Sequence, residues 1–350
     1  MTPPALLIYG ATGYSGRLLA THAAERGLAP IVAGRSAEKV KALAAQLGVE
    51  ARISAIDDAP RLREILAGVS CVLHAAGPFS ATARPMLDAC LAARAHYLDI
   101  TGEIPVFELC ESLGARAREL GVMLMPGVGF DVVPSDCLAA YVAARVPEPH
   151  TLRIAIDALG TPTRGTAKTS IEVMGVGCLV RRAGRIVSLR AGSLQRDFDF
   201  GFGPTRCAAA PLGDLVTAWH STRAENIELY LRAGLGMRAM LRASGPLAPL
   251  LRLRAVQRGL RRMVEMMPEG PNEAERKELR GHIVAEAIGA DGQVARARLD
   301  TPSGYHLTML GGVEIARRVL EGGAKPGYQT PATAFGADLV LGLDCIRTNE

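Results

Sequence analysis

Residues 6–27, LLIYGATGYSGRLLATHAAERG, place three glycines between an apolar run and a stretch of helix-forming residues. The apolar run is short and does not alternate with polar residues, which is typical of a strand buried on both faces of a parallel sheet. The glycines therefore lie in a strand-to-helix turn. The first amides of a helix lack intrahelical partners and carry partial positive charge, and glycine lets a phosphate approach them closely. A tight turn that binds nothing is the alternative, but the strand and helix on either side favour a nucleotide-binding loop. The loop residues predicted to contact the nucleotide are Gly10, Thr12, Gly13, Tyr14, Ser15 and Gly16.

The end of the next strand indicates which nucleotide is bound. In NAD-binding proteins a carboxylate about twenty residues past the loop takes the ribose 2′-hydroxyl. This chain has Arg35 and Ser36 there, and its first carboxylate, Glu38, already lies in the following helix. Arg35 can pair bidentately with a 2′-phosphate, Ser36 can donate a hydrogen bond, and Lys39 lies one turn further on. A solvated charge cluster at a helix start is the alternative; the pattern favours NADP(H) as cofactor.

The chain alternates between strands and helices as far as about residue 145, which predicts a Rossmann-type, doubly wound parallel sheet in an α/β fold. Beyond it the alternation is lost, and a second, α+β domain is predicted over residues 146–325, with residues 326–350 packing back on the first domain. In that second domain we expect a helix over 165–184 and a hairpin around Asp291-Gly292. The expected strands of the first domain are 5–9, 30–33, 51–54, 70–74, 95–100 and 122–125, with helices at 14–26, 37–47, 60–67, 80–93 and 105–120.

The composition is that of a soluble enzyme of ordinary hydrophobicity. The seven cysteines form no C-x-x-C pair and the seven histidines form no H-E-x-x-H motif, so we expect buried reduced thiols and no metal site. The N-terminal residues lead directly into the first strand, which predicts no signal peptide. The uncharged stretch 65–83 is broken by Gly-Pro, so it is interpreted as a strand and a loop and not as a membrane span. A net charge of +5 gives no indication of nucleic-acid binding. We therefore expect a cytoplasmic protein.

Five motifs in order, GATGYSG, AGRSAEKV, AAGPF, AHYLDITGE and MPGVGFDVVPSD, carry a resemblance to a known family. Together they resemble the saccharopine dehydrogenase-like family of NADP-dependent reductases, and within it the trans-acting enoyl reductase branch. The resemblance covers residues 5–137 well and is thinner at GTAKTS and near the C-terminus. It implies that Thr101 and Gly102 lie beside the nicotinamide. The sequence has no Tyr-x-x-x-Lys motif, which argues against a classical short-chain dehydrogenase. The motif MPGVGF has no cysteine, which argues against a reductase that forms a thioester intermediate.

The motif AAGPF ends the fourth predicted strand at the carboxyl edge of the sheet, where open α/β sheets bind ligands. Its small residues let the pyrophosphate and the nicotinamide ribose lie over the backbone, although an ordinary Gly-Pro turn is the alternative. The residues assigned to this contact are Ala76, Gly77, Pro78 and Phe79.

Hydride transfer asks the protein to hold the acceptor against the cofactor and to help a proton arrive. Lys168 in GTAKTS, Asp131 and Tyr305 are candidates for this role, and Asp131 is also expected to line the cleft. Glu103 is interpreted either as a cleft residue or as a carboxylate in the first turn of a helix.

The segment 232–264 holds eight arginines among leucines and methionines and no acidic residue. Such a basic amphipathic segment can lie on a membrane surface or dock an acidic carrier protein. It can equally be a solvated helical face whose arginine stems cover apolar surface. The sequence leaves two further hypotheses undecided: that the protein binds peripherally to a membrane, and that it forms a homodimer.

The sequence thus predicts an NADPH-dependent reductase of an enoyl-type acyl or lipid-like substrate. Two alternatives remain open: a saccharopine-type C–N oxidoreductase acting on an amino-acid adduct, and a non-catalytic NADP(H)-binding regulator.

Overall fold

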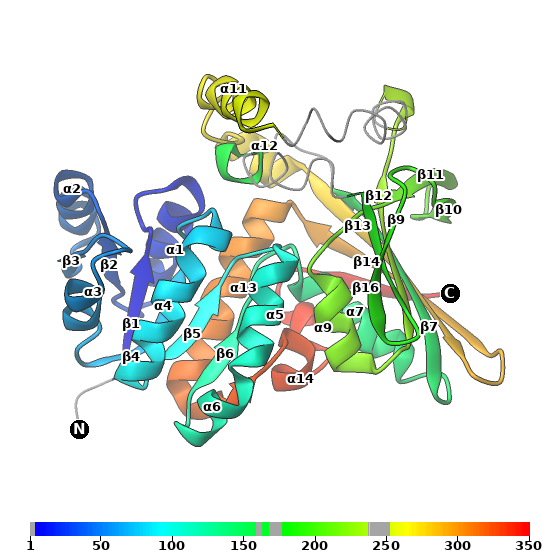
Figure 1. The fold of residues 1–350 in the computed structure, drawn as a ribbon, viewed down its shortest axis with the longest axis horizontal. Coiled ribbons are helices and arrows are strands. Elements are labelled where there is room, and N and C mark those ends of the chain that lie inside the picture. The colour runs from blue at the N-terminus through cyan, green and yellow to red at the C-terminus, as the bar shows by residue number, and fades with distance from the viewer. Residues whose placement is uncertain (1–3, 159–162, 168–176, 237, 239–252) are drawn as a thin grey trace. The chain divides into compact units, whose positions relative to one another are not determined.

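The computed structural model describes residues 4–158, 163–167, 177–236, 238 and 253–350 (Figure 1). Within this part the chain forms two compact units. Unit 1 comprises Met1–Val133 and Tyr305–Ala334, and unit 2 comprises Pro134–Gly304 and Phe335–Glu350. Of the predicted site residues, Lys168 lies outside the described residues.

Unit 1 is built on a parallel sheet of seven described strands in the order β15-β6-β5-β4-β1-β2-β3. Apart from β15, this is the strand order of a dinucleotide-binding doubly wound sheet, so the predicted fold class is confirmed. The strands are β1 (Ala5–Tyr9), β2 (Ile31–Gly34), β3 (Ala51–Ile53), β4 (Val69–His74), β5 (His96–Asp99), β6 (Met123–Met125) and β15 (Gly327–Tyr328).

Helices join successive strands, as the sequence pattern predicts (Figure 1). The expected helix over 105–120 is present as two shorter helices that meet at Leu113. The helices of unit 1 are α1 (Tyr14–Glu25), α2 (Ala37–Leu47), α3 (Ala59–Ile65), α4 (Phe79–Ala93), α5 (Ile104–Ser112), α6 (Gly114–Glu119), most of α13 (Gly304–Arg318) and most of α14 (Pro331–Phe335).

Strand β1 explains why the opening apolar run does not alternate. Leu7 and Tyr9 point into a core shared with α3, α4 and α5. Leu6 and Ile8 are also fully buried, on the opposite face of the strand. On that second side α13 packs against α1, because a Cβ on Gly312 would lie 2.8 Å from the Cδ2 of Leu19. Both faces of the sheet are therefore covered, as in other parallel sheets.

The C-terminal part of the chain divides differently from the prediction. Nearly all of α13 belongs to unit 1, although we expected residues 146–325 to form the second domain. Strand β15 pairs with β6, so residues 327–334 do return to the first unit, as expected of 326–350. Residues 335–350 belong to unit 2, where β16 (Ile346–Asn349) pairs with β14 (Val294–Pro302).

Unit 2 contains a mixed sheet of nine described strands, in which β7 and β12 pair in parallel and the other ladders are antiparallel. The second unit is thus α+β, as predicted. Its other strands are β7 (Pro149–Ala158), β8 (Cys178–Arg182), β9 (Arg185–Leu189), β10 (Gln195–Asp199), β11 (Pro204–Ala209), β12 (Asn226–Arg232) and β13 (Arg280–Gly289), and its helices include α7 (Val133–Ala143), α9 (Asp214–Thr222), α11 (Arg254–Glu265) and α12 (Glu273–Glu278).

Two local predictions in unit 2 have opposite outcomes. The hairpin around Asp291-Gly292 is confirmed, because β13 and β14 pair across it and Gly292 takes a φ of +82°. The helix expected over 165–184 is wrong at its end, since residues 178–182 form β8. In this strand Cys178 and Val180 are more buried than their neighbours, as alternate residues of a strand are. Their side chains belong to the core of unit 2.

Candidate functional site: a nucleotide cradle in unit 1

The three glycines of the opening turn have different physical reasons for lacking a side chain. Gly10 has a φ of +80°, and a Cβ there would lie 2.7 Å from the Cβ of Ala76. A Cβ on Gly16 would overlap the carbonyl oxygen of Gly10. Packing within the protein therefore explains these two glycines, at the turn and at the contact between helix and strand.

Gly13 has no such explanation. Its φ of −75° suits any residue, it is exposed, and a Cβ would approach only the Gly10 carbonyl oxygen, at an ordinary 3.4 Å. It is the N-cap residue of α1 and supplies no capping side chain, and the first turn of α1 has no acidic residue. The bare backbone at Gly13 therefore leaves the positive end of α1 open to an anion.

Arg35 and Ser36 lie where the sequence placed them, between the end of β2 and the start of α2. Ser36 is the N-cap of α2, and its side chain makes no capping hydrogen bond. Arg35 is exposed, and among the described residues no carboxylate pairs with it. Lys39, in the first turn of α2, is also exposed. Within the described part of the chain the Arg35 guanidinium and the Ser36 hydroxyl have no side-chain partner, and together they are suited to a 2′-phosphate.

The AAGPF motif connects β4 to α4, and here the structure decides the role of Glu103. The backbone amide of Phe79 donates to Glu103 Oε1 at 3.0 Å, and that of Ser80 donates to Oε2 at 2.6 Å. Glu103 is buried, so its carboxylate caps α4 from inside the protein. The amides of Phe79 and Ser80 at the N-terminus of α4 are therefore already bonded within the protein.

Asp99, at the end of β5, fixes two of the loops at this edge of the sheet. It is fully buried, and its Oδ1 accepts from the amides of Thr101 and Gly127, each at 2.9 Å. Its Oδ2 accepts from the hydroxyl of Tyr97 at 2.6 Å. Burial raises the pKa of Asp99 to about 6, and these hydrogen bonds to the ionised form limit the rise.

The side chain of Thr101 does not face a ligand. It is 1% exposed, and its Oγ1 accepts from the amide of Glu103 at 3.0 Å. The neighbouring Gly102 is more open: a Cβ there would lie 3.3 Å from the Cβ of Asp131 and 3.4 Å from its Oδ2. The structure thus brings Gly102 and Asp131 together from two separate loops.

Two of the predicted catalytic candidates border this edge of unit 1. Asp131 is reached by solvent, yet the surrounding protein desolvates its carboxyl group and raises its pKa. Tyr305 lies edge-on to Tyr14 at the glycine loop, with ring centroids 5.3 Å apart. On the same helix as Tyr305, the hydroxyl of Thr308 accepts from the amide of Phe130 at 3.0 Å, which holds the loop that carries Asp131.

The cysteines and His74 do not contribute reactive groups. All seven cysteines are free and buried, as predicted, and burial raises the pKa of every thiol. Burial lowers the pKa of His74 to about 3, so its ring is neutral. It contacts the Thr82 hydroxyl at 3.0 Å, and that hydroxyl donates to the carbonyl of Ala76 at 2.7 Å. His74 therefore supports the AAGPF loop.

The structure adds a histidine–carboxylate pair in unit 2 that the sequence analysis did not identify. His282 Nδ1 lies 2.7 Å from Asp300 Oδ1, and both side chains are about one-third exposed. They face each other across the hairpin of β13 and β14. The Asp291-Gly292 turn sets that register, so the sequence did contain the signal for this pair.

Helix α11 carries the described part of the arginine-rich segment. Arg258 and Arg262 are exposed, and so are three apolar side chains at or near its ends: Leu253 (53%), Met263 (61%) and Met266 (79%). Val264 is buried. The interpretation that this helix merely covers apolar core therefore accounts for only part of its apolar surface. None of the helices in the described part of the chain has the length and apolar character needed to span a bilayer.

Part of this chain is similar in sequence to known proteins. Residues 6–125 match the family model of the saccharopine dehydrogenase NADP binding domain. A 154-residue stretch is 34% identical to the trans-acting enoyl reductase of Mycobacterium leprae, covering 42% of this chain and 37% of that protein. The Mycobacterium tuberculosis protein of the same name is 34% identical over 139 residues, 37% of this chain and 33% of its own length. The matches thus span about a third of the length of these relatives.

The fold of the whole chain also has a solved counterpart. Saccharopine dehydrogenase (L-Glu forming) from Saccharomyces cerevisiae superposes with a TM-score of 0.66 over 99% of this chain and 100% of that one, at 13% identity. Unit 1 therefore has a Rossmann-type fold. More particularly, residues 6–125 are similar to the saccharopine dehydrogenase NADP binding domain, and NADP(H) is the cofactor that this match supports.

Proposed function

We propose that this protein is an NADPH-dependent reductase that transfers a hydride to an enoyl-type acyl or lipid-like substrate. The observation that carries the proposal is the combination of two residues. Gly13 has no side chain although no packing in the described structure requires this, and Arg35 has no carboxylate partner among the described residues. Together they suit the diphosphate and the 2′-phosphate of one NADPH molecule. The enoyl specificity is supported by the names of the relatives that are 34% identical.

When bound, NADPH supplies the hydride, and the chain must supply binding, orientation and a proton. Reducing a C=C bond conjugated to a carbonyl leaves an enolate that has to be protonated. Asp131 suits this task, because desolvation raises its pKa and so extends the pH range over which it holds a proton. Its position against Gly102 supports this role, because open α/β sheets bind their ligands at this edge.

The test is a comparison of substrates and variants in an assay of NADPH consumption. The wild type should oxidise NADPH with an α,β-unsaturated acyl thioester and not with a 2-oxo acid plus an amino acid, the reagents of C–N bond formation. Asp131→Asn should lower turnover at least about 100-fold while NADPH binding is unchanged, which is the lower end of the usual range for loss of a general acid. Asp88→Asn, at an exposed surface ion pair, is the matched control.

Two results would contradict the proposal. Reduction of the 2-oxo acid with its amine, without reduction of the thioester, would replace it by C–N chemistry. Equal effects of Asp131→Asn and Asp88→Asn would remove Asp131 as the proton donor while leaving the cofactor assignment in place.

We further propose that α11 docks an acidic carrier protein that bears the acyl substrate. Charge complementarity supports an acidic partner for Arg258 and Arg262, and the exposed Leu253, Met263 and Met266 suit the apolar centre of a small interface.

The double variant Arg258→Gln/Arg262→Gln should raise the Michaelis constant for a carrier-bound thioester and leave that for a short soluble thioester unchanged. In the wild type the same effect should follow from raising salt from about 0.05 to 0.5 M, which shortens the Debye length from roughly 14 to 4 Å. The control is Arg185→Gln/Arg190→Gln, which changes two exposed arginines elsewhere in unit 2. Salt-sensitive binding to anionic vesicles, with no effect on the carrier-bound substrate, would instead identify a membrane surface as the partner.

A further inference from the structure

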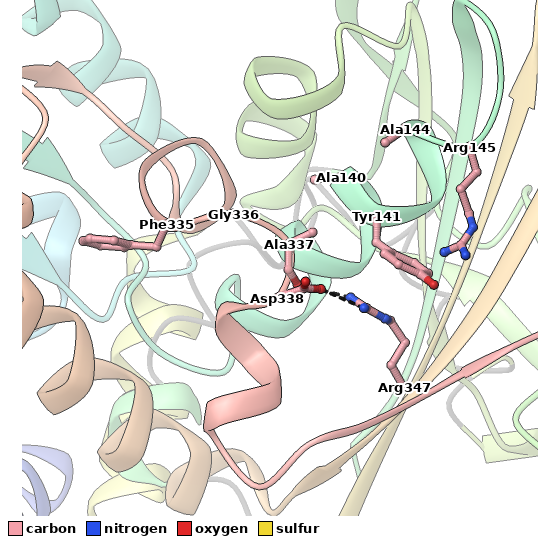
Figure 2. Close-up of a pocket in the computed structure, with 9 residues that line it drawn as sticks. All are labelled: Ala140, Tyr141, Ala144, Arg145, Phe335, Gly336, Ala337, Asp338 and Arg347. Carbon is pink, nitrogen blue, oxygen red and sulfur yellow. Dashed lines mark hydrogen bonds and ion pairs between the residues drawn. The ribbon is translucent and has the colours of Figure 1, made fainter.

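Unit 2 contains a pocket that no part of the proposed reaction uses. It has a volume of about 540 Å³, within the range of small-molecule sites, and all of its lining residues belong to unit 2 (Figure 2). Small residues make the room on two sides: Ala140 and Ala144 come from the end of α7 and the residues after it, and Gly336 and Ala337 come from the segment before the C-terminal strand. The lining of the pocket therefore comes from two parts of the chain that are far apart in the sequence.

The centre of the pocket is a tyrosine between two arginines. The guanidinium carbon of Arg145 lies 3.9 Å from the centroid of the Tyr141 ring, and that of Arg347 lies 3.5 Å from it. Two guanidinium groups cannot share one ring face at these distances, so they stack on opposite faces, and Figure 2 shows the ring between them. The Tyr141 hydroxyl is fixed as well, because it donates to Asn349 Oδ1 at 2.8 Å.

The two arginines differ in what balances their charge. Arg347 donates to Asp338 Oδ1 at 2.7 Å and to the carbonyl of Ala337 at 3.4 Å. Arg145 is exposed, and no carboxylate among the described residues pairs with it. Two cations and one anion leave the pocket with an excess positive charge, and that charge is at Arg145.

Stacking also determines how Arg145 can bind. A guanidinium group that lies flat on an aromatic ring uses its face for the ring and keeps its N–H donors in the plane, directed away from it. Its edge is then held ready for two parallel hydrogen bonds to a carboxylate or a phosphate. Less conformational freedom has to be lost when such an anion binds than for a freely rotating arginine.

We propose that this pocket binds a small organic anion through a carboxylate or phosphate group held by Arg145. Tyr141 and Arg347 position Arg145, and the body of the ligand occupies the hollow beside Ala144 and Gly336. The proposal concerns a second ligand site, in the unit that does not contain the NADP-binding domain, and it is independent of the reaction proposed above.

The experiment measures anion binding by calorimetry on the whole 350-residue chain saturated with NADPH, so that the nucleotide phosphate sites are already filled. The probes are inorganic phosphate, glycerol 3-phosphate and succinate, each compared with sodium chloride at equal ionic strength. The variant is Arg145→Gln, and its matched control is Arg185→Gln, an exposed arginine of the same unit outside the pocket. Melting temperatures establish that both variants are folded.

At least one probe should bind the wild type saturably, with affinity reduced tenfold or more in Arg145→Gln and unchanged in Arg185→Gln. Tyr141→Leu, which removes the ring face but keeps apolar volume, should weaken the same probe, because Arg145 loses its support. Preference for glycerol 3-phosphate over succinate, or the reverse, identifies the anionic group. The proposal is overturned if no probe binds saturably up to about 10 mM, or if Arg145→Gln binds as the wild type does.

Discussion

Replacing Gly13 by valine should abolish NADPH binding while leaving unit 1 folded. The backbone at Gly13 has an ordinary φ of −75°, and the nearest atom to a new Cβ is the Gly10 carbonyl oxygen at 3.4 Å. The only expected stability cost is a poorer N-cap for α1, up to about 1 kcal/mol. The new side chain would, however, stand where a diphosphate must approach the first amides of α1. Each lost hydrogen bond to a charged group is worth about 1.5–3 kcal/mol, so losing two should raise the Kd for NADPH about 100-fold or more.

Gly16→Ala supplies the opposite control. Its methyl group would overlap the Gly10 carbonyl oxygen, so the loop or the helix must move, at a cost of about 1–3 kcal/mol or more. Fluorescence titration with NADPH and urea unfolding, run on both variants, should show lost binding with retained stability for Gly13→Val and lost stability for Gly16→Ala. The reasoning is refuted if Gly13→Val binds NADPH as the wild type does, or if it unfolds as readily as Gly16→Ala.

Three further predictions concern single residues of the cradle. Arg35→Asp should weaken NADPH binding by about 2–3 kcal/mol and NADH binding much less, because only NADPH carries the 2′-phosphate; equal losses in fluorescence titrations would contradict the assignment. Asp99 has a folded pKa of about 6, above its ordinary value, so the stability that its protonated form contributes is complete below about pH 4 and is lost as the pH rises through 6. Asp99→Asn should remove this dependence of the unfolding free energy on pH. The difference in unfolding free energy, wild type minus variant, should therefore fall between about pH 4 and 6 and level off above. A difference that stays constant with pH in urea unfolding would refute the prediction. Glu103→Ala should destabilise the protein by about 1–3 kcal/mol, since two amides of α4 lose their acceptor, and Glu103→Gln should restore part of the loss; equal stability of Glu103→Ala and the wild type would exclude the capping role.

The sequence predicts the parallel sheet of unit 1 well because its signals are local. Each strand is a short apolar run, and each turn that follows it carries glycine, proline or a helix-capping residue within a few positions. The predicted boundary of the second domain is wrong where the chain returns to unit 1, at Tyr305–Ala334. Nothing in the 20 residues around Gly312 distinguishes a helix of unit 2 from one that packs on α1, because both need the same apolar face. The contact of Gly312 with Leu19 joins residues far apart in the sequence, and only the folded structure reveals it.

The same limit applies within the site. The position of Thr101 beside the cofactor was implied by resemblance, and its loop does lie at the expected edge of the sheet. The direction of its side chain depends on the amide of Glu103, which in turn depends on where α4 begins. Hydrogen bonds of this kind have no periodicity, so a sequence pattern does not predict them.

The choice between two helices shows how the structure resolves what the sequence leaves ambiguous. Both α1 and α4 follow a strand of the same sheet and a turn that contains glycine, so both are expected to bind phosphate. The two helices differ in whether the N–H groups at their N-termini already have an acceptor within the protein. At α4 the amides of Phe79 and Ser80 already donate to the buried carboxylate of Glu103, and a phosphate there would meet a negative charge. At α1 the N-cap is Gly13, which has no side chain and whose missing side chain no internal contact explains. We therefore propose that the diphosphate binds at α1 and that the AAGPF turn contacts the neutral part of the cofactor through its backbone.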